Sequence, residues 1–336
     1  MKNLRVLRSR KIYSDGNHNA FTTLVKCGNI LYAAFRTASE HLADDGVITV
    51  LKSLDDGKTW EVFGRKGCEN WDLRDPGLVV LADKVHLFCF GRKAADVSET
   101  SSFHCTLQEN GQFSPLEILK NMPVIWGVAT RNGKIYGTAY HSEGKNASRV
   151  TLHVSSDGVN WEKLTELPFP GNEASIDFDP DGTLWALVRD THDCRCYGGG
   201  SIPVLCRLEP PYTGTPFSVP LALRLQGPML KRVNGTSVIA GRRWDGWERN
   251  RRNLRTDLFI IPDGEDCRFV STLPSGGDTS YAACVEMPGN RLLLTYYSSH
   301  EHTMDLPFEE DDPKDPAKAE HSTPADIFVA EISKNF

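Results

Sequence analysis

Ser53-Leu54-Asp55-Asp56-Gly57-Lys58-Thr59-Trp60 is typical of a tight turn that ends in a packing aromatic residue. Serine and aspartate side chains hydrogen-bond nearby backbone amides in such turns, glycine supplies an unusual φ, and tryptophan packs between neighbouring sheets. A shorter copy, Ser155-Ser156-Asp157-Gly158-Val159-Asn160-Trp161, follows later in the chain. The recurrence of one turn indicates a repeat architecture, in which these turns lie on outer hairpins.

Six segments share one pattern, in which two short apolar stretches flank a tight turn of Gly, Asp or Asn. This pattern predicts β-hairpins. The hairpins are expected over residues 22–36, 78–92, 125–141, 173–189, 228–242 and 281–297, and they end in Arg36, Arg92, His141, Arg189, Arg242 and Tyr297. Subtracting successive residue numbers gives spacings of 56, 49, 48, 53 and 55 positions. Such a period suits the four-stranded blade of a β-propeller.

Other apolar stretches, at residues 48–52, 150–154 and 257–261, are expected to form outer strands of these blades. The sequence therefore predicts an all-β, six-bladed propeller that occupies residues 1–336 as one domain. Residues 326–332 are expected to pair with residues 4–12, because this pairing closes the ring and removes an exposed sheet edge. Residues 301–322 are too charged and proline-rich for a strand, and we expect an inserted acidic loop that is either a solvated insertion or a lid.

The composition is that of an ordinary globular protein with a large core. Of the 336 residues, 40% are hydrophobic and 24% are charged. The formal net charge of -6 gives no general attraction to nucleic acid or to an anionic membrane, so any anion must be bound by local arginine clusters. No run approaches about 18 apolar residues, and the first residues lack the apolar core of a signal peptide.

The nine cysteines are odd in number and irregularly spaced. They predict no disulfide framework and favour a reducing, cytoplasmic location. Cys194 and Cys196 are too close together for the usual zinc pair, and His300 and His302 would point to opposite faces of a strand. We therefore expect neither a metal nor any other cofactor.

The turn at residues 53–60 matches the Asp-box of sialidases and related propellers, Ser-x-Asp-x-Gly-x-Thr-Trp, at every defined position. The chain thus resembles the sialidase (neuraminidase) superfamily with its BNR repeats, and the resemblance in site residues runs from Phe35 to about Glu301. Leu73-Arg74-Asp75-Pro76 and residues 296–301 are more similar to a bacterial branch of the superfamily than to proven sialidases. Because the Asp-box is a structural motif, it implies the fold and not the chemistry.

Sialidases carry one arginine in the first blade, an aspartate in the loop after it, a glutamate and an arginine around one hairpin of the fourth blade, an arginine in the fifth and a tyrosine opening the sixth. The resemblance implies that these residues are Arg36, Asp44 or Asp45, Glu173, Arg189, Arg242 or Arg243, and Tyr281. We expect further substrate contacts from His18, Arg74, Asp75, Arg92, Trp126, His141, Asp278 and Tyr297.

Propeller topology gives a separate reason for these residues to meet. The start of an innermost strand and the end of the second strand lie on the same face of the ring. This rule pairs Glu173 with Arg189, Tyr281 with Tyr297, Asp75 with Arg92, and His18 with Arg36. The loops that carry Asp44, Asp45 and Arg243 are expected on that same face.

The residue types suit the cleavage of an acidic sugar. Guanidiniums such as those of Arg36, Arg189 and Arg242 bind a carboxylate by planar, charge-assisted hydrogen bonds. The resemblance implies that Tyr281 is the nucleophile, an exception among glycosidases, and that Glu173 takes its proton. Asp45 or Asp44 would then protonate the leaving oxygen.

The function expected from the sequence is a retaining exo-glycosidase that acts on sialic acid or a similar acidic sugar. One alternative is a hydrolase or lyase for another uronic or ulosonic sugar on the same fold. Another is a non-catalytic propeller that binds acidic carbohydrate without turning it over.

Overall fold

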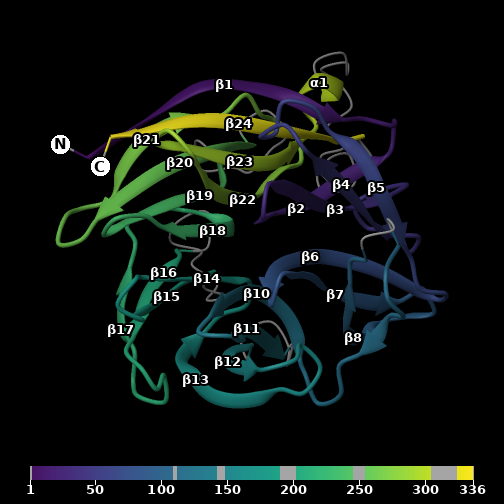
Figure 1. Cartoon of the computed structure of the whole chain (residues 1–336), viewed down its shortest axis with the longest axis horizontal. Coiled ribbons are helices and arrows are strands. Elements are labelled where there is room, and N and C mark those ends of the chain that lie inside the picture. Colours follow the sequence, from purple (N-terminus) through teal and green to yellow (C-terminus); the bar gives the residue numbers. More distant parts are fainter. Residues whose placement is uncertain are drawn as a thin grey trace, which may run out of the picture.

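The computed structural model describes residues 2–108, 112–141, 148–189, 202–244, 254–303 and 324–335. Within these residues the chain forms six four-stranded antiparallel sheets, arranged as blades around a common axis (Figure 1). The prediction of a six-bladed propeller is therefore confirmed. No helix in the described part of the chain combines the length and apolar character that a membrane crossing requires.

Each blade runs from an innermost to an outermost strand. Blades 1 and 2 comprise β2 (His18–Cys27), β3 (Ile30–Ala38), β4 (Val47–Ser53), β5 (Glu61–Lys66), β6 (Trp71–Leu81), β7 (Lys84–Lys93), β8 (Asp96–Thr106) and β9 (Glu117–Ile118). Blades 3 and 4 comprise β10 (Val124–Arg131), β11 (Lys134–His141), β12 (Arg149–Ser155), β13 (Glu162–Pro170), β14 (Ala174–Phe178), β15 (Leu184–Val188), β16 (Val204–Leu208) and β17 (Phe217–Pro220). Blades 5 and 6 comprise β18 (Gln226–Arg232), β19 (Thr236–Trp244), β20 (Leu254–Pro262), β21 (Arg268–Thr272), β22 (Thr279–Met287), β23 (Arg291–Ser298), β24 (Asp326–Asn335) and β1 (Asn3–Tyr13).

The two ends of the chain close the ring, as the sequence predicts. Strand β1 pairs antiparallel with β24, in a register that runs from Asn3 opposite Asn335 to Tyr13 opposite Ile327. Figure 1 shows these purple and yellow strands side by side, with the N- and C-termini close together. Blade 6 is thus built from both ends of the chain, and β24 has a partner on each side.

The turns at residues 53–60 and 155–161 form the hydrogen bonds that their sequences predict. Ser53 Oγ accepts from the Gly57 amide at 3.0 Å, Asp55 Oδ1 accepts from the Thr59 amide at 2.9 Å, and Trp60 donates to the Gly57 carbonyl. The corresponding bonds recur in the second copy. Both turns connect the third strand of a blade to its outermost strand, so they lie far from the axis.

Five of the six innermost strands carry a β-bulge at equivalent points. The register breaks between Ala20 and Thr23, Arg74 and Gly77, Ile125 and Val128, Gln226 and Met229, and Ser280 and Ala283. Four residues within these breaks have positive φ: Phe21 (62°), Asp75 (46°), Gly227 (55°) and Tyr281 (46°). A bulge re-aims the side chain that it carries. All four residues line the central channel, whose volume is about 390 Å³.

The expected acidic loop at residues 301–322 lies mostly outside the described residues. Its described beginning belongs to α1 (His300–Thr303), a single helical turn directly after β23. Cys194 and Cys196 also lie outside the described residues.

Candidate active site

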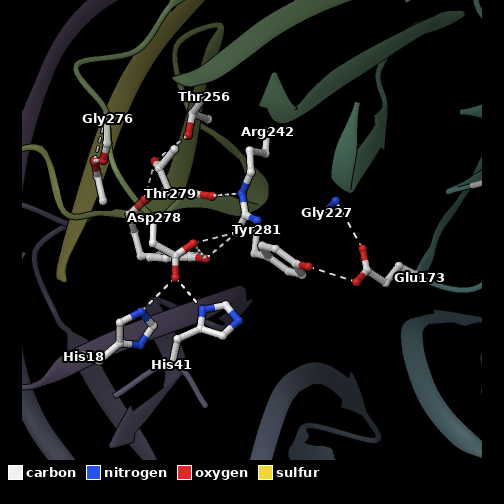
Figure 2. A network of polar contacts seen from close by, with 12 residues as sticks. His18, His41, Glu173, Gly227, Arg242, Thr256, Gly276, Asp278, Thr279 and Tyr281 are labelled. Atoms are coloured by element: carbon white, nitrogen blue, oxygen red, sulfur yellow. Dashed lines mark hydrogen bonds and ion pairs between the residues drawn. The ribbon is translucent and has the colours of Figure 1, made fainter. Parts of the chain in front are cut away.

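Tyr281 and Glu173 form the centre of the site. The Tyr281 hydroxyl donates to Glu173 Oε1 at 2.9 Å, and Arg189 Nη1 donates to the same oxygen at 2.6 Å. Glu173 Oε2 accepts from the Gly227 amide at 3.2 Å, so both carboxylate oxygens are held (Figure 2). A phenol, a carboxylate and a guanidinium from blades 4 and 6 are therefore in direct contact, although Glu173 and Tyr281 are far apart in the sequence.

The Tyr281 ring is enclosed by aromatic and cationic groups. The rings of Phe21 and Trp126 meet it edge-on, with centroids 4.9 and 5.5 Å away, and the Arg242 guanidinium lies 5.3 Å from its centroid. Burial raises the pKa of Tyr281 well above its ordinary value, and the nearby charge of Glu173 raises it further, against Arg189 and Arg242. The phenol therefore keeps its proton in the resting state, and that proton points at Glu173.

Arg242 belongs to a second network, built on Asp278. Arg242 Nη2 donates to Asp278 Oδ1 at 2.8 Å and to the Tyr297 hydroxyl at 2.7 Å, and Tyr297 in turn donates to Asp278 Oδ1. Its Nε donates to the Thr279 carbonyl, next to the bulge that carries Tyr281. This network fixes the guanidinium over the phenol ring.

Two histidines complete the Asp278 network. His18 Nε2 lies 2.8 Å and His41 Nδ1 lies 2.5 Å from Asp278 Oδ2 (Figure 2). Burial lowers the pKa of His41 to about 3, so its ring is neutral and donates to the carboxylate. Among the described residues, His18, His41 and Asp278 are the group of possible metal ligands whose ligand atoms lie within 4.8 Å of one another. Both histidines bind one oxygen of Asp278 and Arg242 binds the other, so the three groups form one hydrogen-bond network around the carboxylate.

Asp75 lines the same central channel as Tyr281. Its Oδ1 is buried without a hydrogen-bond partner in the described part of the chain. Burial raises the pKa of Asp75 to about 7, the charge of Glu173 adds to the rise, and Arg74 opposes it. Burial raises the pKa of the Tyr140 hydroxyl as well, and the charges of Glu173 and Asp75 raise it further.

Arg36 lies deeper than the sequence suggests. Its side chain is 0% exposed, and Nε donates to Asp72 Oδ1 at 2.7 Å while Nη1 and Nη2 donate to the carbonyls of Glu40 and Ala43. Asp72 also accepts from Arg74 at 3.0 Å and Arg92 at 3.2 Å. Arg36 therefore departs from the expectation that three guanidiniums share one substrate carboxylate, because all three of its nitrogens already bind protein oxygens.

Other expected residues are not brought to Tyr281. Asp44 and Asp45 are exposed, and Asp45 accepts from the Ser39 amide. Arg243 pairs with Asp257 at 3.0 Å, and His141 is exposed. Of the four expected neighbour pairs, Glu173 and Arg189 are in direct contact. The ring centroids of Tyr281 and Tyr297 lie 6.1 Å apart. Arg92 instead pairs with Asp72, and His18 with Asp278.

Three residues of the site were missed by the sequence analysis. His41 lies three positions before Asp44, in the loop that was expected to supply an acid, but it is the residue that points inward. Tyr140 precedes His141 at the end of a strand, where adjacent side chains point to opposite faces. Asp72 is two positions before Arg74, and this alternation places both side chains on one face of β6.

Comparison with known proteins supports the fold. No protein-family model and no curated protein sequence matches the chain significantly. Among solved structures, a Dyadobacter fermentans protein of unknown function matches with a TM-score of 0.73 and 16% identity, over 99% of this chain and 100% of that one. A Penicillium chrysogenum alpha-L-arabinanase complexed with arabinobiose matches with a TM-score of 0.66 and 14% identity, over 97% and 98%.

Trypanosoma rangeli sialidase in complex with the inhibitor DANA also matches, with a TM-score of 0.65 and 13% identity, over 94% of this chain. The chain spans 55% of the length of that sialidase. At these identities the likeness concerns the fold, which this chain shares with glycoside hydrolases that handle different sugars.

Proposed function

We propose that this protein is a retaining glycosidase in which Tyr281 is the nucleophile and Glu173 is its base. The observation that supports the proposal most strongly is the 2.9 Å hydrogen bond from the Tyr281 hydroxyl to Glu173 Oε1. A nucleophile within hydrogen-bond reach of a base, which a third group orients in turn, is the arrangement that covalent catalysis needs. Arg189 is that third group, because it binds the same carboxylate oxygen at 2.6 Å.

In the proposed reaction each group has one step. Tyr281 attacks the anomeric carbon as its proton passes to Glu173, and a covalent glycosyl-tyrosine forms while the glycosidic bond breaks and an acid protonates the leaving oxygen. Water then attacks the same carbon and gives one proton back to that acid, and the proton on Glu173 returns to the tyrosine oxygen. Arg189 and Arg242 stabilise negative charge on the phenol oxygen during both steps, since both oppose the rise in the pKa of Tyr281.

An acidic sugar is the substrate class that we propose first. Arg189 binds the partner of the tyrosine, Arg242 lies over the Tyr281 ring and Arg74 lies over the Phe21 ring, so three guanidiniums gather around the tyrosine despite the negative net charge of the chain. Nε and Nη2 of Arg189 have no hydrogen-bond partner within the described residues, which leaves donors for a carboxylate. Charge-assisted hydrogen bonds of this kind are the strong ones.

A neutral sugar is the second candidate, and the burial of Arg36 favours it. Arg36 is paired with Asp72 and two loop carbonyls, so the third guanidinium expected to bind a substrate carboxylate already binds protein oxygens. Because removing one partner of a buried ion pair is costly, a substrate carboxylate would have to compete with Asp72 for this guanidinium. The two remaining arginines would bind a substrate carboxylate less strongly than three arginines.

A panel of chromogenic glycosides separates these possibilities. It contains nitrophenyl glycosides of sialic, glucuronic and galacturonic acids, and matching glycosides of neutral arabinose, galactose and glucose. We expect turnover of an acidic member, and kcat that falls at least about 10³-fold in both Tyr281→Phe and Glu173→Gln. Turnover of neutral members alone would favour the second candidate. Activity that survives both substitutions would contradict the proposed mechanism.

A further inference from the structure

Asp75 has the features of a functional carboxyl group that the fold does not need. Its Oδ1 is buried without a partner in the described part of the chain, and its backbone holds a φ of 46° that non-glycine residues rarely adopt. A buried polar atom without a hydrogen bond costs stability, and so does a left-handed backbone. Both costs fall on the same residue, inside the cavity that contains Tyr281.

Asp75 and Tyr281 are presented by the same backbone device. Each lies in the bulge of an innermost strand, β6 for Asp75 and β22 for Tyr281, and both have a φ of 46°. The pKa of Tyr281 responds to the charge of Asp75, and the pKa of Asp75 responds to the charge of Glu173. The two bulges therefore direct a carboxyl group and a phenol into one space around the axis.

A retaining glycosidase needs a proton donor for the leaving oxygen, and the residues expected for that role lie elsewhere. Asp44 is exposed, and the Asp45 carboxylate is engaged by the Ser39 amide at 3.1 and 3.2 Å. Arg36 donates hydrogen bonds to two carbonyls of the loop that carries them. The side chain of this loop that points inward is His41, which binds Asp278. Asp75 thus remains as the carboxyl group near Tyr281 whose oxygen has no protein partner in the described chain.

We propose that Asp75 is the acid and base of the reaction, an inference that rests on the proposed function. In the first step its carboxyl proton passes to the glycosidic oxygen as the bond to the anomeric carbon breaks, while Tyr281 bonds to that carbon and its own proton passes to Glu173. In the second step the Asp75 carboxylate takes a proton from the attacking water. The carbon–tyrosine bond breaks, the Glu173 proton returns to Tyr281, and both residues regain their starting states.

The environment of Asp75 suits both halves of this cycle. Burial raises its pKa to about 7, so the carboxyl group holds a proton near neutral pH and can release it nearby. A general acid is most effective when its pKa lies close to the working pH. Arg74, the preceding residue, limits the rise in the pKa of Asp75 and stabilises the carboxylate once it forms.

The test compares Asp75→Asn with Asp44→Asn and Asp45→Asn on one glycone with two leaving groups. Asparagine keeps the size of aspartate and tolerates a positive φ, so Asp75→Asn should fold. A dinitrophenyl glycoside needs no protonation to leave, whereas a methyl glycoside does. We expect kcat/KM of Asp75→Asn to fall about 10²- to 10⁴-fold on the methyl glycoside and less than about tenfold on the dinitrophenyl glycoside. Neither matched variant should show this dependence on the leaving group.

A second readout uses the wild-type enzyme. The methyl glycoside should give a basic limb in kcat/KM with an apparent pKa near 7, and the dinitrophenyl glycoside should lack that limb. Equal losses on both substrates in Asp75→Asn, or leaving-group dependence in Asp45→Asn, would overturn the assignment of Asp75 and leave the Tyr281–Glu173 pair intact. A wild-type enzyme that cleaves neither substrate, or a Tyr281→Phe variant as active as wild type, would overturn the proposed function and this inference with it.

Discussion

At the scale of single residues, the position of the Tyr281 ring depends on Gly227. A Cβ atom at position 227 would lie 2.7 Å from both Cδ2 and Cε2 of Tyr281, closer than real Cβ contacts allow. The Gly227 amide also donates to Glu173. Glycine at this bulge therefore lets the backbone approach both members of the proposed catalytic pair.

Gly227→Ala should displace the tyrosine ring and lower kcat/KM by about 10²-fold, because a misplacement of about 1 Å has effects of that size. Gly28→Ala is the matched control: its φ of 57° is close to the 55° of Gly227, but no atom lies within 4 Å of the added Cβ. Both variants should lose roughly 1–2 kcal/mol of stability from backbone strain. Kinetics and thermal unfolding of the two proteins test this prediction, and equal activities would argue against a spatial role for Gly227.

The sequence predicted some residues of this site and missed others for a physical reason. Glu173 and Arg189 were found because the two ends of one hairpin must lie on one face of a propeller. His41, Asp72 and Tyr140 were missed because their roles depend on which way a loop folds and which side of a strand a residue faces. Asp44 and Asp45 illustrate the same limit, since the loop was identified and its inward residue was not.

At the scale of elements, the second copy of the turn packs on a pair of histidines from blade 2. His86 Nδ1 lies 3.0 Å from His104 Nε2, and a Cβ atom at Gly158 would lie 3.0 and 3.1 Å from these two nitrogens. Burial lowers the pKa of both imidazoles, to about 4 for His104. The contact between blades 2 and 3 therefore requires neutral histidines.

This contact predicts a loss of stability in mild acid. The unfolded chain takes up protons on these histidines near pH 6.5, whereas the folded protein resists them until about pH 4 for His104, so stability falls as the pH drops through that window. Each such histidine adds a slope of up to about 1.4 kcal/mol per pH unit. Urea unfolding from pH 7.5 to 4 should show a shallower slope for His104→Gln than for wild type. His141→Gln, at an exposed histidine, should follow the wild-type curve.

The bulges are elements that no sequence pattern announced. Hairpins were predictable because their turns contain Gly, Asp and Asn at short range. The bulge positions contain residues as different as Phe21, Asp75 and Tyr281, so no common residue type marks them. Their positions are set by convergence of the innermost strands at the axis, which is a property of the assembled ring.

At the scale of the whole molecule, ring closure joins the two ends of the chain. Leu4 on β1 is 4% exposed and packs with Met229, Val233 and Leu292 of blades 5 and 6, whereas Leu7 on the same strand is 49% exposed. Leu4→Ala should therefore lower the free energy of unfolding by about 2–5 kcal/mol, and Leu7→Ala should change it by less than about 0.5 kcal/mol. Denaturant unfolding checks both values. A loss for Leu4→Ala as small as that expected for Leu7→Ala would mean that β1 contributes little to closing the ring.

The arrangement of the blades was predictable because it repeats. Six hairpins at a period near fifty residues, and one turn that occurs twice, gave the number of blades and the pairing of β1 with β24. The chemistry was less predictable, because the same ring supports glycoside hydrolases with different substrates. In the proposed function, the substrate class depends on how a few arginines are paired, and Arg36 with Asp72 is the pair that the sequence did not indicate.

Trapping the covalent intermediate decides whether Tyr281 is the nucleophile. The enzyme would be mixed with the dinitrophenyl glycoside that it cleaves, quenched in acid during turnover, digested and analysed by mass spectrometry. We expect one added glycosyl unit on the peptide that contains Tyr281, and no such adduct in Tyr281→Phe. An adduct on Glu173 or Asp75 would contradict a Tyr281 nucleophile. So would steady turnover of a substrate whose deglycosylation is slow, if no adduct is found.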